Sequence, residues 1–414
     1  MSAVTQFNPI GLSYSELYAL LQRMRKDEPV FHWAEHDCWV FNKYDDIVAI
    51  LKDRRFSNEG SLEVMNKSYC PAAKQLLSQG INWNETVQVN GAEGATHTRL
   101  RGVMQSILTP QRFRKMEPSV QQMVRKRIDS FVADGHCDFV AQFCYPLPVE
   151  VIFDVIGFKT DEEDLAQLQV WSNDMFRLWL VPMPEADQVR CAKHALEFQR
   201  YMRRKIADRR RNPREDLLTE FVRRLDSGES KITEDELVLI FPMNLIGAGH
   251  ETTKAQLSNI MYQLLVDPSR WQAVVEHPET IPEVIEECMR LDGSVVAWYR
   301  TTTEAVEIAG KQLPRKANVI MMFGAGNHDE GKFENSESFC PTRGVRNGHL
   351  TFSADRHFCL GAPLARMEMK IALEELARRL PNLRLAPHQV VEYDPSVAVR
   401  VIHALQLEWD APKH

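Results

Sequence analysis

The sequence predicts a mainly α protein with a smaller β portion. From about residue 97 to residue 290, apolar residues recur at the 3.6-residue period of helices. Short alternating runs, typical of strands, occur only toward the two ends of the chain. No internal repeat and no Gly/Ser/Pro-rich linker divides the sequence. Length alone would suggest two or three domains, but without a linker we expect a single domain over residues 1–414, with β-rich parts at about 30–60, 300–325 and 390–410.

The N-terminal elements follow from local patterns. Residues 14–28 form an amphipathic pattern that ends before Pro29, so we expect a helix there. Residues 30–41 are predicted to form a β-hairpin, and residues 44–51 a helix. Near the other end, alternating runs at 305–323 surround Gly310 and Pro314, and 390–410 alternates again. Both of these stretches are expected to contain strands.

A single long helix is predicted between Thr233 and Asp267. Thr233 and Glu236 fit a capping box, and the apolar pattern stops before Asp267-Pro268. At 1.5 Å per residue, about 33 residues would span about 50 Å. Its middle is Gly-Ala-Gly-His-Glu-Thr-Thr (residues 247–253), a poor helix former. Such small residues allow a bulky group to approach the backbone, although a packing kink would explain them equally well.

Composition excludes several classes of protein. The 414 residues include 50 Lys+Arg and 57 Asp+Glu, so the net charge is −7. Hydrophobic residues make up 44% and charged residues 26%, which is typical of globular proteins rather than disordered ones. The mild acidity argues against a nucleic-acid partner. Because the most apolar stretch, residues 237–249, is shorter than the roughly 20 residues of a spanning helix, we expect a cytoplasmic protein with no membrane contact.

One of the eight cysteines stands in an informative context. Cys359 lies in Phe-Ser-Ala-Asp-Arg-His-Phe-Cys-Leu-Gly (residues 352–361), and Pro363 suits the first turn of a following helix. A cysteine at such a junction is stabilised as a thiolate by the helix N-terminus, and would act as a nucleophile or as an axial metal ligand. A lone cysteine is more often a small buried hydrophobe.

Further motifs decide between these interpretations. The segment 352–361 resembles the haem-binding signature Phe-Gly-x-Gly-x-His/Arg-x-Cys-x-Gly of the cytochromes P450, the haem-thiolate monooxygenases. Residues 248–253 resemble the oxygen-activating stretch of that family's central helix, and 287–290 its Glu-x-x-Arg pair. Residues 339–343 and the His-x-x-x-Arg at 97–101 resemble two further family segments, in the family's order.

The resemblance implies a cofactor and a set of site residues. The cofactor is haem b, with the Cys359 thiolate as the axial ligand of its iron. Thr252 and Glu251 would deliver protons during O₂ activation, and Glu287, Arg290 and Arg343 would form a structural ion-pair network. Four cations would bind the propionates: His97, Arg101, Arg300 and His357. The other cofactor-binding residues are Phe352, Gly361 and Ala248. The substrate pocket would be lined by Leu245, Ala248, Val295, Val296 and Val397, with a lid near residues 60–95.

The cysteine loop departs from the family pattern at two positions. Ser353 and Asp355 replace the two glycines that precede the ligand. If these positions require positive φ, Asp tolerates that conformation better than most residues, whereas Ser has less reason to be there.

The resemblance also implies partners. Residues 324–326 are a lone Gly-x-Gly, and the sequence has neither a Gly-x-Gly-x-x-Gly after a strand nor length for a flavin domain. We therefore expect electrons from a separate ferredoxin with its NAD(P)H-dependent ferredoxin reductase. The resemblance implies that one atom of O₂ enters a small organic substrate, by hydroxylation or, as variants of the same chemistry, by O-dealkylation or epoxidation. Alternatives are a non-oxygenating or peroxide-driven haem-thiolate enzyme, and a haem sensor or carrier. The cations expected to meet an acidic redox partner are Arg112, Arg114, Lys115 and Arg356.

Overall fold

The structure is a computed structural model that describes residues 7–59, 69–81, 88–158, 162–229, 231–344 and 348–410. The chain forms two compact units. The first comprises Met1–Ser57, Glu117–Leu147 and Thr252–His414, and the second comprises Asn58–Met116 and Pro148–Glu251. Whether they make up the single domain expected from the sequence stays a prediction. The expected lid at 60–95 falls partly outside the described residues, at 60–68 and 82–87.

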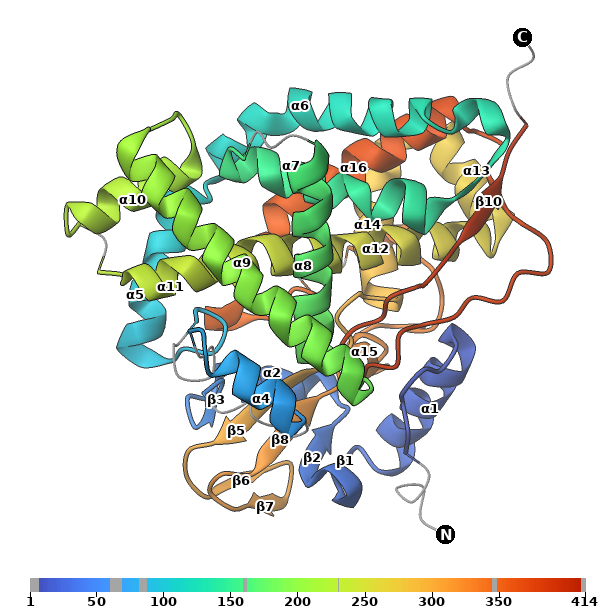
Figure 1. Ribbon diagram of the computed structural model, residues 1–414. Coiled ribbons are helices and arrows are strands. Elements are labelled where there is room, and N and C mark those ends of the chain that lie inside the picture. The colour runs from blue at the N-terminus through green and yellow to red at the C-terminus, as the bar shows by residue number, and fades with distance from the viewer. Residues whose placement is uncertain are drawn as a thin grey trace. The chain divides into compact units, whose positions relative to one another are not determined.

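The first unit contains a five-stranded sheet with the order β1-β2-β8-β5-β3 (Figure 1). Only the β2–β8 pair is parallel. Helix α2 (Tyr44–Lys52) contributes Ile47 and Ile50 to the core beneath the sheet, where they pack with Phe41 and Val319. The strands are β1 (Val30–Trp33), β2 (Cys38–Phe41), β3 (Phe56–Ser57), β5 (Trp298–Thr302) and β8 (Asn318–Met321).

The predicted hairpin at 30–41 is confirmed, and so are the strands predicted within 305–323. β1 and β2 pair antiparallel, with Val30 opposite Phe41. β6 (Val306–Ile308) and β7 (Lys311–Leu313) pair through a two-residue loop at Ala309 and Gly310, whose φ angles are 49° and 70°. Two positive φ angles match the right-handed twist of the flanking strands, which explains the glycine in this turn.

The prediction of strands over 390–410 is only partly correct. β10 (Gln406–Glu408) pairs with β4 (His136–Asp138) and β9 (Arg384–Leu385). The preceding stretch has isolated bridges, Tyr393 to Ile402 and Val399 to Val295, rather than a strand. Its course is irregular because the Arg400 side chain turns inward to the buried Asp292, with Nε 2.9 Å from Oδ1.

The helices of the first unit begin with α1 (Tyr14–Asp27), which confirms the prediction for 14–28. Ser13 and Glu16 form its capping box. α14 (Ile281–Leu291) packs against α16 (Ala362–Arg379), and α13 (Pro268–Glu276) also contacts α16 (Figure 1). Because α14 is buried along most of its length, three of its charged side chains, Glu286, Glu287 and Arg290, lie in the interior.

The second unit is helical in its described residues. α8 (Glu162–Leu180) packs along α9 (Glu185–Arg211), and α4 (Pro71–Leu77) covers another part of α9 (Figure 1). The unit also contains α5 (Gly94–Ile107), α10 (Leu217–Asp226) and α11 (Glu234–Leu239). Three helices have residues in both units: α6 (Pro110–Asp129), α7 (Pro146–Ile156) and α12 (Ala248–Leu265). The mainly α fold class is confirmed.

The predicted long helix is continuous in its course but not uniform. α11 begins at the Thr233–Glu236 capping box, and α12 ends at Leu265. Between them, Ile240–Gly247 forms a π-helix (η5) instead of the expected α-helix. Pro242 contributes because it has no backbone N–H for the α-helical ladder. Among the described residues, no helix combines the length and apolar character needed to cross a bilayer.

Candidate active site

The loop before α16 holds Cys359 by backbone hydrogen bonds. The Cys359 N–H donates to the Phe352 carbonyl at 2.9 Å, which closes the loop. The Phe358 N–H donates to the Asp355 carbonyl at 3.0 Å. Gly361 is the N-cap of α16, and Pro363 lies in its first turn, as the sequence predicts. Cys359 therefore lies directly before a helix N-terminus, where the helix dipole favours negative charge on sulfur.

The exposure of its thiol distinguishes Cys359 from the other cysteines. Cys359 is exposed, Cys340 is half-buried, and the remaining six are buried. Burial raises the pKa of the Cys38 and Cys137 thiols to about 12, so these groups resist ionisation. Cys359 is the exposed residue among the eight cysteines, and it lies at a helix start.

Both residues that replace glycine in the loop adopt left-handed backbone conformations. Ser353 has φ 60° and Asp355 has φ 57°. This region disfavours side chains that carry a Cβ, by about 1–2 kcal/mol per residue, and Asp tolerates it better than Ser. The fold thus retains the loop conformation that glycine favours, at the cost of local strain at Ser353.

Replacing Ser353 by glycine should stabilise the protein. We expect Ser353→Gly to raise the free energy of unfolding by about 0.5–1 kcal/mol, because relief of backbone strain exceeds the added entropy of the unfolded chain. Ser353→Ala is the matched control, since it removes the hydroxyl but keeps the Cβ. Chemical denaturation of the three proteins measures the difference. Equal stability of the Gly and Ala variants would contradict the strain argument.

A second set of contacts fixes α16 to α14. Arg366 donates from Nε and Nη2 to the Glu286 carboxylate at 2.6 and 2.9 Å, and the same carboxylate lies 3.1 Å from His349 Nε2. The Arg366 guanidinium also lies 4.7 Å from the centroid of the Phe352 ring. Burial alone would raise the pKa of Glu286, but hydrogen bonds from Arg366 and His349 lower it to about 2. Glu286 thereby ties both sides of the cysteine loop to α14.

The Glu286 carboxylate should make the free energy of unfolding depend on pH in the acidic range. Because the pKa of Glu286 falls from 4.5 to about 2 on folding, its contribution is complete above about pH 5 and is lost as the pH falls toward 2. The difference corresponds to about 3 kcal/mol. In Glu286→Gln the loss of stability between pH 6 and pH 3 should therefore be smaller than in the wild type, measured by denaturation at each pH. Glu283→Gln, at an exposed position of α14, should retain the wild-type slope.

The neighbouring residue on α14 organises a second ion-pair network. Glu287 and Arg290 are both fully buried, with Oε1 and Nη2 2.8 Å apart. Arg343 Nε lies 3.3 Å from the same carboxylate oxygen. Arg290 also donates to the carbonyls of Asn327 and Ser336 at 2.8 and 2.7 Å. The structure brings together the three residues that the sequence analysis grouped.

The expected propionate-binding residues divide between the two units. In the first unit, Arg300 on β5 is 1% exposed and donates from Nη1 to the Tyr299 carbonyl at 2.7 Å. His357 is half-buried in the short turn Asp355–His357. In the second unit, the buried His97 and the half-buried Arg101 lie one turn apart on α5. Their meeting at one cofactor stays a prediction.

The start of α12 combines an exposed small side chain with buried polar ones. Ala248 is exposed, whereas Leu245 and Glu251 are each 2% exposed. A Cβ added at Gly249 would lie 3.1 Å from Ile152 Cδ1, so this glycine allows the close approach of α7. Thr252, the next residue along α12, is half-buried. Gly249 is thus required for packing against Ile152.

Comparisons with known proteins decide the family. The family profile described as Cytochrome P450 matches residues 29–281 and 275–392. The chain belongs to the cytochrome P450 family. A cytochrome P450 of Priestia megaterium is 32% identical over 84% of each chain. The 6-deoxyerythronolide B hydroxylase of Saccharopolyspora erythraea is 30% identical over 89% of each chain. The solved structure of cytochrome P450 CREJ in complex with (4-ethylphenyl) dihydrogen phosphate has a TM-score of 0.91 and 28% identity over 98% of this P450 and 100% of that chain.

Family membership makes this P450 an oxidoreductase, a monooxygenase of the haem-thiolate type. In that family a cysteine thiolate is the axial ligand of the haem iron. The residues present fit such a group. In the first unit, Cys359 lies at a helix start and Arg300 places a buried cation on β5.

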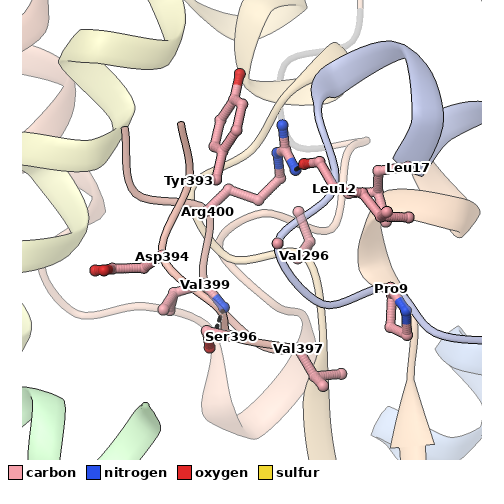
Figure 2. Close-up of a pocket in the computed structure, with 11 residues that line it drawn as sticks. Pro9, Leu12, Leu17, Val296, Tyr393, Asp394, Ser396, Val397, Val399 and Arg400 are labelled. Atoms are coloured by element: carbon pink, nitrogen blue, oxygen red, sulfur yellow. Dashed lines mark hydrogen bonds between the residues drawn. The ribbon is translucent and has the colours of Figure 1, made fainter. Parts of the chain in front are cut away.

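Two residues expected in the substrate pocket line a very small cavity. Val296 and Val397 lie in the wall of a cavity of about 10 Å³, together with Leu12 and Tyr393 (Figure 2). That volume holds about one water molecule and no organic substrate. Arg400 closes this region, because its Nη1 donates to the Leu12 carbonyl at 3.2 Å and its guanidinium lies 3.8 Å from the centroid of the Tyr393 ring. Their role in substrate binding, like that of Val295 and Leu245, stays a prediction.

The sequence analysis missed two residues that the structure makes prominent. Glu286 precedes the recognised Glu287 and could have been noticed as the first member of a buried Glu-Glu pair. His250 lies inside the recognised stretch 248–253 but received no role. The structure places it in contact with Glu251, with Nε2 2.7 Å from Oε1. No pattern of spacing signals that contact, because adjacent residues of a helix do not ordinarily face each other.

Proposed function

We propose that this P450 hydroxylates a small organic molecule with O₂, using electrons from a separate ferredoxin and its NAD(P)H-dependent ferredoxin reductase. The observation that carries the proposal is the exposed Cys359 thiol at the start of α16, together with a Glu251-Thr252 pair at the start of α12. When bound, haem b supplies O₂ activation, so that one oxygen atom enters the substrate and the other leaves as water.

The chain's own residues would hold that group from several elements. Cys359 is the proposed axial ligand, and Phe352 and Gly361 shape its loop. The proposed partners of the propionates are cations, because charge-assisted hydrogen bonds to carboxylates are strong and Arg binds them bidentately. They are His97, Arg101, Arg300 and His357. Glu287, Arg290 and Arg343 would act by stabilising the fold rather than by touching the cofactor.

Thr252 and Glu251 are the residues proposed to deliver protons to the reacting oxygen. The Thr252 hydroxyl both donates and accepts hydrogen bonds, so it would orient a water beside the reacting oxygen. Glu251 is a carboxyl group that can release a proton and take it up again. Because Glu251 is only 2% exposed, water exchanges with it slowly unless a neighbouring group assists.

The proposed substrate is apolar and compact. Leu245, Ala248, Val295, Val296 and Val397 are the proposed lining, and aliphatic walls of this kind select organic molecules by shape. The similarity to 6-deoxyerythronolide B hydroxylase, whose name states its reaction, supports hydroxylation over other outcomes. A cytoplasmic location stays a prediction.

The proposed redox partner is acidic. Arg114 and Lys115 are exposed on α6, as a docking surface requires. Two other cations named from the sequence are engaged within the protein. Arg112 pairs with Glu220 at 2.8 Å, and Arg356 donates to the carbonyls of Leu51 and Phe56. We therefore expect Arg114 and Lys115 to contribute more to association with a ferredoxin.

Labelled O₂ tests the reaction. A panel of small molecules is first screened for shifts of the haem spectrum, and the best ligand is then incubated with ferredoxin, reductase, NAD(P)H and labelled O₂. We expect one labelled oxygen atom in the product, and Thr252→Ala should lower the product formed per NAD(P)H consumed. Product that forms only with added peroxide, or product without labelled oxygen, would favour the peroxide-driven or non-oxygenating alternative.

A further inference from the structure

His250 lies between two hydrogen-bond acceptors in the interior of the second unit. Its Nδ1 is 2.9 Å from the Ile246 carbonyl oxygen, and its Nε2 is 2.7 Å from Glu251 Oε1. His250 is 0% exposed and Glu251 is 2% exposed. On α8, Ser172 Oγ is 3.5 Å from the same Nδ1. The imidazole ring therefore connects a backbone carbonyl and a serine on one side with the Glu251 carboxyl group on the other.

The contacts of the His250 ring determine which of its nitrogens carry hydrogen. A carbonyl oxygen only accepts hydrogen bonds, so Nδ1 carries a hydrogen. In a neutral imidazole with hydrogen on Nδ1, Nε2 holds a lone pair. A lone pair 2.7 Å from an ionised carboxylate oxygen is repelled, and burial strengthens the repulsion because the local dielectric constant is low. One additional proton must therefore lie on Nε2 or on Oε1.

We infer that His250 and Glu251 share one transferable proton, and that His250 is a positioning residue for proton delivery through Glu251. The pair exists as imidazolium with carboxylate, or as neutral imidazole with carboxylic acid. Both forms place a proton on Glu251 or on the ring nitrogen that lies 2.7 Å from its Oε1. The inference rests on the proposed roles of Glu251 and Thr252, which are consecutive residues of α12.

The proton balance is simple. In the imidazolium form, the proton on His250 Nε2 moves to Oε1 of the Glu251 carboxylate, so that Glu251 becomes a carboxylic acid and the ring becomes neutral while Nδ1 keeps its hydrogen. No electron moves in this step. When this carboxylic acid releases its proton on the side of Thr252, the Nε2 lone pair faces a carboxylate, and this repulsion favours uptake of one proton from solvent water. The pair thus returns to its starting state after each transfer.

The shared proton has a direct spectroscopic test in the holoenzyme. In the ferrous carbon monoxide form, nitrogen NMR of labelled histidine, with His250 assigned by its loss in His250→Gln, reports the protonation of both ring nitrogens. Difference infrared spectra against Glu251→Gln report a carboxylic acid. We expect either two protonated ring nitrogens or a Glu251 carboxylic acid at neutral pH. An Nε2 without hydrogen together with an ionised Glu251 would overturn the inference.

Turnover of the variants tests the consequence. His250→Gln keeps a hydrogen-bonding side chain but cannot hold a transferable proton, so we expect about a tenfold lower kcat, less product per NAD(P)H and an unchanged KM. His250→Asn is the second variant if Gln perturbs folding. The matched control is His194→Gln, because His194 also contacts a carboxylate in the same unit, with Nδ1 2.6 Å from Asp174, and lies outside the proposed relay. The control should keep wild-type coupling.

The outcomes separate this inference from the proposed function. If the wild type incorporates labelled oxygen and His250→Gln does so with the same kcat and coupling, the inference is wrong and the monooxygenase proposal stands. If the wild type incorporates none, the proposed function fails, while the NMR and infrared result still decides whether the proton is shared. A larger solvent isotope effect on kcat in His250→Gln than in His194→Gln supports the inference.

Discussion

Cys359→Ala should abolish the spectrum typical of a thiolate-ligated haem. In the wild type, the reduced carbon monoxide complex is expected to show the strongly red-shifted Soret band that a cysteine thiolate produces. Alanine has no ligand atom, so the variant should lose that band and all monooxygenase activity. Absorption spectra of the reduced protein with and without carbon monoxide measure the effect. The substitution removes one sulfur atom from a loop residue outside the hydrophobic core, so the polypeptide fold should persist.

Cys340→Ala is the matched control for the ligand assignment. Cys340 is half-buried, and its backbone N–H, which alanine retains, donates to Glu287 at 3.0 Å. We expect its spectrum to equal that of the wild type. A retained red-shifted band in Cys359→Ala, or its loss in Cys340→Ala, would disprove the assignment. Circular dichroism of both variants shows whether a lost band reflects the ligand or unfolding.

The elements that could be predicted from sequence are those with strong local signals. The Thr233–Glu236 capping box, the 30–41 hairpin and the helix starting before Pro363 each have a sequence pattern that determines the backbone locally. The π-helical turn at Ile240–Gly247 has no such pattern, since Pro242 within an apolar run is equally compatible with a kink. The irregular course of 390–405 likewise depends on Arg400 meeting Asp292, a contact between residues distant in sequence.

In the candidate site, too, the sequence predicts local motifs but not contacts that depend on tertiary packing. The resemblance to the family's motifs identified Cys359, Thr252 and the Glu-x-x-Arg pair as candidates, and the roles of Cys359 and Thr252 stay predictions. The conformation of Ser353 and Asp355 was left conditional, and only the φ angles of 60° and 57° show that both occupy the left-handed region. Contacts made through side-chain rotamers, such as Glu286 with Arg366 or His250 with Glu251, depend on the packing of whole helices. A single sequence does not specify such packing.

Glu287→Gln should destabilise the protein more than any other single substitution of a charged residue considered above. Glu287 Oε1 lies 2.8 Å from Arg290 Nη2 and 3.3 Å from Arg343 Nε. The backbone N–H of Cys340 donates a hydrogen bond to the same oxygen. Because Glu287 and Arg290 are both 0% exposed, removing one charge leaves the other buried without its counter-charge. Breaking such a pair costs about 3–5 kcal/mol. Chemical denaturation should show this loss, together with a reduced haem content after expression.

The cause can be assigned by comparing both members of the pair. Glu283→Gln lies on the same helix at an exposed position and should change stability by less than about 0.5 kcal/mol. If the buried charge of Arg290 is the source of the loss, Glu287→Gln with Arg290→Met should be less destabilised than the sum of the two single variants, since the double variant buries no unpaired charge. If the losses of stability in the two single variants add up in the double variant, the destabilisation comes instead from the separate hydrogen bonds that Arg290 donates to Asn327 and Ser336. In either case we expect the haem that remains bound to keep the red-shifted Soret band, because the network stabilises the fold and Cys359 supplies the ligand.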